Sequence, residues 1–502
     1  MDVKKQLEKL FAILDEADAY SRGIGKLYFD IDCVAPPDGL DRAGRDAAVI
    51  GKRLYSLTHS KRYAALLQEI AAGDFAGLTP VQKRSVEKLI ESYEKEKNVS
   101  PSLAYRADLI FNQARNDWLR AKTASDFSMF RDSFGAVVDM TRKLISKRDV
   151  QGETPYDTLL DDFEKGGSIK QLDGFFADLK KHIVPLVGRI TREGKSIRDD
   201  FLQRPVSVDR QEKFSRYLLS LEGLRDSSLV FMTTEHPFTT SFGPDDIRVT
   251  THFYEENFVS NIFSTLHEGG HALFMQNEPA EYFEQHAADN MTSAMHECIS
   301  RFYENIIGRS REFVSFIMPK LREFSGPVFD DVSDAEMYEA VNIASPGLIR
   351  MEADELTYCI HIMIRYELEK EFVNGTLKID DVPEAWNSRY REYLGVEVPD
   401  DASGCLQDVH WTGGYGYFPS YALGNAYGAQ ILRTMEKDFD VFAAVGRGDL
   451  GRIGTWLTEN VFPYASMMDP DEWIRKITGE SLNVGYYTEY LERKFKGLYG
   501  LD

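Results

Sequence analysis

The sequence predicts a mainly α-helical protein that folds as one continuous body. Long stretches alternate apolar and charged residues with a period close to 3.6, which is the pattern of amphipathic helices. The chain has no internal repeat, no low-complexity tract and no Pro/Ser-rich linker at which it would divide. We therefore expect one large helical domain, although 502 residues alone would suggest about three.

The helical period is clearest in a set of stretches separated by Gly- and Pro-rich turns, such as the Pro-Pro-Asp-Gly sequence at 36–39. These stretches are residues 1–20, 62–72, 82–97, 101–148, 170–194, 209–226, 311–325, 351–375 and 427–437. Each is expected to form a helix with one apolar face toward the core.

One segment departs from the helical pattern. Residues 239–242 and 247–253 are rich in Thr and apolar residues and flank a Gly-Pro-Asp-Asp turn at 243–246. Two such runs around a turn predict a β-hairpin. Because an isolated hairpin is only marginally stable in water, this one must pack on other elements. It either covers a helix end or offers an edge to an extended peptide.

The charge balance excludes several classes of partner. Lys and Arg total 59 and Asp and Glu total 81, which gives a formal net charge of −22. Such a surface repels nucleic acid and anionic membranes, and no apolar stretch reaches the ~18 residues of a membrane span. The four cysteines are scattered without a Cys-x-x-Cys pair, and the first residues carry no secretory signal. We therefore expect a reducing, cytoplasmic location.

The histidines indicate a metal site. Six of the ten lie between residues 236 and 296, where an even spread would place about one. Among them, residues 267–271 read His-Glu-Gly-Gly-His, an H-E-x-x-H motif with helical flanks. On a helix, His267 and His271 share one face and can reach one ion, while Glu268 is placed to take a proton from a water that the metal activates. The two glycines cost about 1 kcal/mol each in a helix, which indicates that another group approaches closely.

A catalytic metal site of this kind needs a third protein ligand. The candidates downstream of the motif are Glu284, His286, Asp289, His296, Glu297 and Glu304. Spacing alone does not separate them, but zinc peptidases favour a carboxylate. Glu297 lies on a second amphipathic stretch at 290–305, which fits a helix–loop–helix that returns to the metal. Zn²⁺ is the expected ion, and Co²⁺ or Mn²⁺ would accept the same ligands.

Further motifs follow one another along the chain. They are H-P-F at 236–238, D-x-R-x-T at 246–250, H-E-x-x-H at 267–271, His-Glu at 296–297, I-R-x-x-A-D at 349–354 and G-x-x-Q-D-x-H-W at 404–411. With these motifs, and with a matching stretch at 154–162, the sequence resembles the carboxypeptidase Taq family of metallocarboxypeptidases from about residue 100 to its end. It departs from the family at Cys298 and Ile299, where H-E-S/G-Q is usual, so packing behind the ligand and metal preference are expected to differ.

The resemblance implies a fold similar to that of angiotensin-converting enzyme and the oligopeptidases. In this fold two helical lobes flank a deep groove, and a small β-hairpin or sheet lines the active site. The resemblance also implies His267, His271 and Glu297 as metal ligands and Glu268 as the general base. We expect an amino-terminal lobe at about 1–230, a metal-site and groove region at about 231–425 and carboxy-terminal helices at 426–502, all in one catalytic domain.

The related enzymes use a downstream His and Tyr to stabilise the tetrahedral intermediate. The matching residues here are His410 and Tyr421, and Tyr415 and Tyr417 are competing choices for the tyrosine. Both groups would donate hydrogen bonds to the developing oxyanion.

A positive side chain is needed if the substrate ends in a free carboxylate. We assign this role to Arg350, because a guanidinium binds a carboxylate with two hydrogen bonds. The alternative is a structural salt bridge from Arg350 to Glu352 or Asp354. Arg248 and His236, from two upstream motifs, are weaker substrate-binding candidates.

The expected activity is release of single amino acids from peptides with a free C-terminus. The alternatives are an endo-oligopeptidase of the same fold, or a non-catalytic protein that binds peptides or metal. The resemblance further implies a homodimer, with neither nucleic-acid nor membrane partners.

Overall fold

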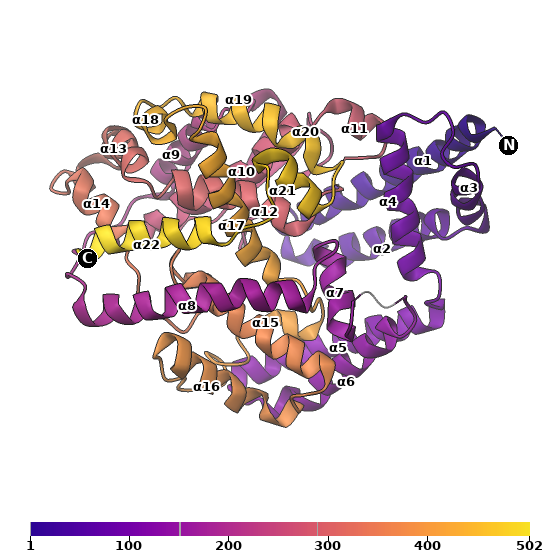
Figure 1. Ribbon diagram of the computed structural model, residues 1–502, viewed down its shortest axis with the longest axis horizontal. Coiled ribbons are helices and arrows are strands. Elements are labelled where there is room, and N and C mark those ends of the chain that lie inside the picture. Colours follow the sequence, from indigo (N-terminus) through magenta and orange to yellow (C-terminus); the bar gives the residue numbers. More distant parts are fainter. Residues whose placement is uncertain (1, 150–151, 289, 502) are drawn as a thin grey trace.

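The structure is a computed structural model that describes residues 2–149, 152–288 and 290–501. It confirms a mainly α-helical protein with one small sheet (Figure 1). The helices before the sheet are α1 (Val3–Cys33), α2 (Leu40–Thr58), α3 (Lys61–Ala72), α4 (Pro80–Glu96), α5 (Pro101–Ala124), α6 (Ser128–Ile145), α7 (Pro155–Phe163), α8 (Ile169–Glu193) and α9 (Val208–Leu221). Within the described residues, no helix has the length and apolarity to cross a membrane.

Most of the helices after the sheet lie in the centre and left of the view in Figure 1, away from α1 and α3. They are α10 (Phe258–Asn277), α11 (Ala280–Glu284), α12 (Ser293–Arg301), α13 (Arg311–Ser325), α14 (Asp334–Ala340), α15 (Tyr358–Asn374), α16 (Val382–Leu394), α17 (Phe418–Met435), α18 (Val441–Gly446), α19 (Leu450–Asn460), α20 (Phe462–Ala465), α21 (Pro470–Thr478) and α22 (Gly485–Tyr499). Helix α12 continues directly into a π-helical segment, Phe302–Ile307.

Local sequence explains where several helices begin. Thr79 accepts a hydrogen bond from the backbone N–H of Gln82, whose side chain accepts one in return, and Pro80 occupies the first turn of α4. Helix α7 begins with the same reciprocal arrangement between Thr154 and Asp157. Such capping boxes satisfy backbone N–H groups that have no partner within the helix.

The predicted helical stretches all contain helix, but four were clearly wrong in extent. The stretch 1–20 ends too early, because α1 runs to Cys33. Residues 101–148 form two helices, because the chain turns at Ser125, which adopts a left-handed conformation with φ of 52°. In the stretch 351–375, α15 begins only at Tyr358, after a 3₁₀ turn at Arg350–Glu352. Helix α17 was expected only from residue 427, because its first half is buried on nearly all sides and shows no amphipathic period.

The sheet has three strands in the order β1-β3-β2: β1 (Leu229–Thr233), β2 (Thr239–Ser241) and β3 (Ile247–Thr251). The predicted hairpin is confirmed, since β2 and β3 pair antiparallel with Thr240 opposite Arg248. Strand β1 was not predicted, and it adds to β3 in parallel. The sheet packs on α10, with Ile247 and Val249 fully buried.

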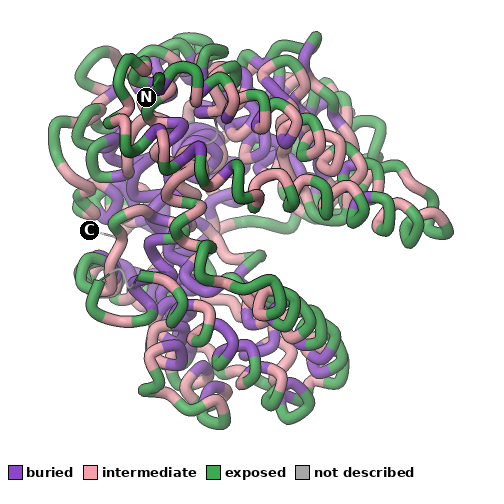
Figure 2. The backbone as a smooth tube through the Cα atoms, turned by 90° about the vertical axis from the view of Figure 1, so that its right-hand side faces the viewer, coloured by how far each residue is buried: buried purple, intermediate pink, exposed green. Residues whose placement is uncertain are grey.

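Three hydrophobic clusters lie among the described residues, and the smallest consists of Val81, Tyr282 and Ala287. Two larger ones hold most of the structure together. The larger one runs from Ala114 to Tyr499 and includes α10, α12 and α17. A smaller one joins α1, α3 and α4 at one end of the molecule (Figure 1). In Figure 2 the backbone forms two masses that join on one side, with buried residues through the join. Helix α12 lies between α10 and α17, and this arrangement builds the candidate site.

Candidate metal centre and active site

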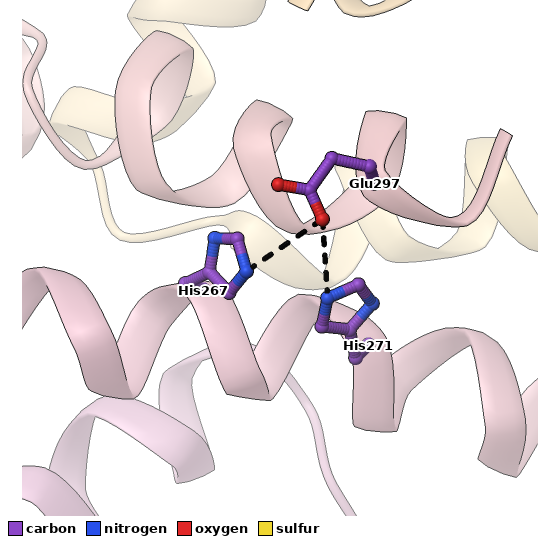
Figure 3. A group of neighbouring side chains, drawn as sticks. All are labelled: His267, His271 and Glu297. Atoms are coloured by element: carbon purple, nitrogen blue, oxygen red, sulfur yellow. Dashed lines mark ion pairs between the residues drawn. The ribbon is translucent and has the colours of Figure 1, made fainter. Parts of the chain in front are cut away.

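Two neighbouring helices bring three donor side chains together. His267 and His271 project from one face of α10 toward Glu297 of α12 (Figure 3). The Glu297 Oε2 atom lies 3.9 Å from His267 Nε2 and 3.7 Å from His271 Nε2. One donor atom from each residue lies within 4.8 Å of the others. In the described part of the chain this is the one group of His, Cys, Asp and Glu side chains with such spacing, and we call it the three-residue cluster.

Glycines allow the helices to approach this closely. A Cβ atom at Gly270 would lie 2.8 Å from the Cα atom of Ser300 in α12. On the other side of α12, a Cβ atom at Gly424 of α17 would lie 3.0 Å from the Glu297 side chain. The group that approaches the glycines of the H-E-x-x-H helix is therefore the protein itself, and at Gly269 it is the buried carboxyl group of Glu222.

The Nδ1 atom of each histidine contacts a second side chain. His267 Nδ1 lies 2.9 Å from Glu304 Oε2, and His271 Nδ1 lies 2.5 Å from His296 Nδ1. These contacts leave both Nε2 atoms facing Glu297. A histidine that binds a metal commonly donates its other N–H group to a carboxylate or similar acceptor, which fixes the ring. Glu304 and His296, two alternatives for the third ligand, thus contact the outer side of the imidazoles.

Arg301 links Glu297 of α12 with Glu304 of the π-helical segment that follows. Its Nε atom donates to Glu297 Oε1 at 2.8 Å, and its Nη1 atom donates to Glu304 Oε2 at 3.0 Å. Residues 297, 301 and 304 have the i, i+4, i+7 spacing that places side chains on one face. Sequence reasoning missed Arg301, although this spacing was available as a signal.

The remaining candidates for the third ligand lie elsewhere. His286 Nδ1 lies 2.8 Å from Asp18 Oδ2 of α1, and Glu284 is exposed at the end of α11. Asp289 lies outside the described residues. Within the described residues, the structure therefore places Glu297 alone, of the six, against both Nε2 atoms.

Glu268 is buried beside the cluster and is held by the hairpin. The Thr239 hydroxyl of β2 lies 2.7 Å from Glu268 Oε2 and 3.0 Å from its backbone oxygen. Burial raises the pKa of Glu268, while His267 and the Thr239 hydrogen bond oppose this shift. Thr239 is a site residue that the sequence did not identify, because the contact depends on how β2 packs on α10.

Arg350 is buried in an ion-pair network. Its Nε atom donates to Asp408 Oδ1 at 3.0 Å, and the fully buried Arg365 donates from Nε to Asp408 Oδ2 at 2.7 Å. The salt-bridge partners considered from the sequence, Glu352 and Asp354, were wrong. Glu352 is exposed, and Asp354 accepts hydrogen bonds from backbone N–H groups at the start of α15.

The three candidate tyrosines have different surroundings. Tyr415 is buried and donates its hydroxyl proton to the backbone oxygen of Trp411 at 2.8 Å. Tyr417 and Tyr421 pack edge to face with ring centroids 5.0 Å apart. Burial raises the pKa of both, so their hydroxyl groups stay protonated at neutral pH and can donate. The ring of Tyr421 also lies 5.5 Å from the guanidinium carbon of Arg350.

His410 stacks on Tyr417 with ring centroids 6.2 Å apart. Burial lowers the pKa of His410 to about 4; Asp408 opposes the shift, and Arg350 and Arg365 add to it. The imidazole is therefore neutral at neutral pH and carries one N–H group that can donate.

Arg248 and His236 are not joined to the cluster. Arg248 pairs with Asp246, with Nε 2.9 Å from Oδ1, and its guanidinium lies over the rings of Phe29 and Phe242. His236 is exposed between β1 and β2. Among the described residues, no hydrogen bond or ion pair connects either side chain to the three-residue cluster.

Comparison with known proteins decides the family. A family model described as carboxypeptidase Taq (M32) metallopeptidase matches residues 9–495. The chain belongs to this family. Carboxypeptidase 1 of Bacillus subtilis is 36% identical over 99% of this chain and 100% of its own length. Thermostable carboxypeptidase 1 of Thermus thermophilus is 33% identical over 96% of this chain and 97% of its own.

Comparison with solved structures supports the same family. The crystal structure of the M32 carboxypeptidase from Deinococcus radiodurans R1 matches with a TM-score of 0.95 and 31% identity, over 99% of this chain and 100% of that one. As a member of the carboxypeptidase Taq family, the chain is a metallocarboxypeptidase, a hydrolase that acts on peptides with a divalent metal. The resemblance seen in the motifs is thus confirmed, and it extends over nearly the whole chain.

Proposed function

We propose that the chain is a zinc-dependent carboxypeptidase that releases one C-terminal amino acid at a time. In this proposal His267, His271 and Glu297 hold the metal and Glu268 is the general base. One observation carries the proposal: two Nε2 atoms and one carboxylate oxygen converge beside a buried glutamate.

The donor set fits a catalytic zinc ion. Two imidazoles and one carboxylate are the protein ligands of many zinc peptidases, and they leave one position for water or substrate. Glu304 and His296 hold the outer Nδ1 atoms, as expected for ligands of fixed orientation. Co²⁺ and Mn²⁺ accept the same set. When bound, the ion would polarise the scissile carbonyl and lower the pKa of water.

Glu268 would transfer a proton from the attacking water to the leaving amine. With Oε2 held by Thr239, the carboxylate can accept a proton from the attacking water and pass it to the leaving amine. Its burial excludes bulk solvent, which would otherwise weaken the interaction of the carboxylate with the reacting groups.

His410 and Tyr421 would donate hydrogen bonds to the oxyanion. The hydroxyl of Tyr415 is committed to Trp411, which favours Tyr421 or its neighbour Tyr417. One donor of this kind is worth about 3 kcal/mol in related chemistry.

Arg350 would bind the terminal carboxylate of the substrate. Asp408 occupies its Nε atom, so the Nη atoms remain for the substrate, although Nη1 also lies 3.4 Å from the Tyr358 hydroxyl. Such a contact would restrict cleavage to the last peptide bond. We assign Arg248 and His236 to more distant parts of the substrate.

The wider assignments are also part of this proposal. We propose a homodimer, a cytoplasmic location and one catalytic domain with an amino-terminal lobe at about 1–230, the site region at about 231–425 and carboxy-terminal helices at 426–502. The site would lie in a groove between two lobes, where an extended peptide could reach the hairpin.

The decisive variant is Glu268→Gln. It should retain one metal ion per chain and lose peptide hydrolysis, because only the base is removed. Glu222→Gln is a matched control, since this buried carboxyl group faces the same helix from behind, at Gly269. Full activity of Glu268→Gln would exclude the assignment. A wild-type chain that holds metal without hydrolysing peptides would instead indicate a binding protein.

A further inference from the structure

A buried carboxyl group outside the proposed mechanism connects α12 and α17. Glu164 follows α7 directly and is 5% exposed. Its Oε1 atom accepts hydrogen bonds from the backbone N–H of Ala294 at 2.7 Å and from the hydroxyl of Ser420 at 2.8 Å. Its Oε2 atom accepts one from the hydroxyl of Thr292 at 2.9 Å. Neither catalysis nor metal binding as proposed above uses this residue.

The three donors belong to the starts of two helices. Thr292 is the N-cap residue of α12 and Ala294 lies in its first turn, whereas Ser420 lies in the first turn of α17. Helix α12 carries Glu297, and Tyr421 follows Ser420 directly. A single side chain thus holds the beginning of the helix with the third metal ligand and the beginning of the helix with the oxyanion donor.

Neither helix caps itself. The side chain of Thr292 makes no capping hydrogen bond within α12, and Tyr417 makes none at the start of α17. The first N–H groups of a helix have no partner within the helix and need outside acceptors. Glu164 supplies this acceptor to α12 from a third element, so the position of α12 depends on it.

Close packing makes this dependence consequential. Because Gly424 of α17 lies against Glu297, a shift of either helix start changes where the carboxylate points. A metal ligand or oxyanion donor displaced by about 1 Å can cost two orders of magnitude in rate.

We propose that Glu164 is a positioning residue that fixes Glu297 and Tyr421 relative to each other through the starts of α12 and α17. This inference rests on the proposed roles of those two residues. Glu164 acts by accepting hydrogen bonds, so its shape and its acceptors matter more than its charge. Burial raises its pKa to about 7, which is consistent with a group that need not be ionised.

The first test compares Glu164→Ala with Glu164→Gln in the full chain. We expect Glu164→Ala to weaken Zn²⁺ binding, measured by competition with a chelator, and to lower kcat, each about tenfold. Glu164→Gln should restore both, because its amide oxygen can accept from Ala294 and Ser420 while the Thr292 hydroxyl turns to accept from its NH₂ group.

Asp157→Ala is the matched control. Asp157 is a buried carboxylate of α7, and it caps α7 and α8. Among the described residues, its hydrogen bonds involve neither α12 nor α17. We expect it to lower Tm while metal affinity and kcat stay unchanged. If Asp157→Ala lowers both as much as Glu164→Ala does, the role of Glu164 is general stability and the proposal is wrong.

Two milder variants test the contacts to α12 and to α17 individually. They also test the proposal if Glu164→Ala does not fold. Thr292→Val should weaken metal binding, and Ser420→Ala should lower kcat with KM and metal content unchanged. Unaltered metal affinity and kcat in both variants would overturn the proposal.

If the wild-type chain binds Zn²⁺ but hydrolyses no peptide, the proposed function fails. The metal affinities of Thr292→Val and of a folded Glu164→Ala still test Glu164, and unchanged values contradict it.

Discussion

Gly270 of α10 lies directly against the backbone of Ser300 in α12, with only 2.8 Å between the Ser300 Cα atom and the place where a Cβ atom would stand. Since both histidines of the three-residue cluster are on α10 and Glu297 is on α12, this contact sets the distance between the imidazoles and the carboxylate. The glycine in the H-E-x-x-H motif is thus explained by helix packing.

Gly270→Ala should therefore push the two helices apart. The clash is with backbone, which cannot rotate away, so we expect a loss of about 1–3 kcal/mol in the free energy of unfolding together with weaker metal binding. Gly428→Ala is the control on the far side of α12, because its Cβ atom would meet Ile306 at an ordinary 3.4 Å. That variant should be neutral or up to about 1 kcal/mol more stable. Urea titration of both variants measures the difference, and equal effects would contradict this account of the packing.

Arg350→Ala should impair hydrolysis of peptides with a free C-terminus far more than hydrolysis of the same peptides with an amidated end. The loss of a charged hydrogen-bonded pair predicts a decrease of about 10–100-fold in kcat/KM for the free acid. Parallel assays with the two substrates measure it, and the amide serves as the internal control. A similar decrease for both would remove Arg350 from this role.

Asp408→Asn should destabilise the fold. The carboxylate lies between Arg350 and Arg365, and the variant leaves two buried guanidinium groups without a full counter-charge. Breaking a buried ion pair in this way costs about 3–5 kcal/mol. Denaturant unfolding provides the measurement. A loss below about 1 kcal/mol would mean that solvent or another group replaces the carboxylate.

Glu369 predicts a pH dependence of stability. This buried carboxyl group accepts hydrogen bonds from the Tyr156 hydroxyl and the Gly416 N–H, and burial raises its pKa to about 8. Between about pH 5 and pH 8 the folded chain keeps a proton that the unfolded chain has lost, so the free energy of unfolding falls as the pH rises. Glu369→Gln should remove this part of the decrease. Identical slopes for the variant and the wild type across this range would show that the pKa is not raised.

The sequence predicts helices best where one face is apolar and the other charged. The first half of α17 was not predicted, because this helix is buried on nearly all sides and lacks a charged face. The division between α5 and α6 was not predicted either, because the residue in the left-handed conformation there is Ser125 and not a glycine. Strand β1 pairs in parallel with β3, and no turn signal marks such a pairing.

For the site, the sequence predicts the residues that form motifs but not the contacts that orient them. The motif positions placed His267, His271 and Glu297 as ligands, and the structure brings these three together. The contacts of Glu304 with His267 and of Asp408 with Arg350 depend on tertiary packing. The second of these overturned the salt-bridge partners that local spacing suggested.

Mass spectrometry of peptide products over time tests the central claim most directly. A metal-loaded wild-type chain should convert a free-acid peptide into a series that shortens by one C-terminal residue at each step, and a chelator should stop the series. Internal fragments, or equal cleavage of the amidated peptide, would contradict the claim and indicate an endo-oligopeptidase.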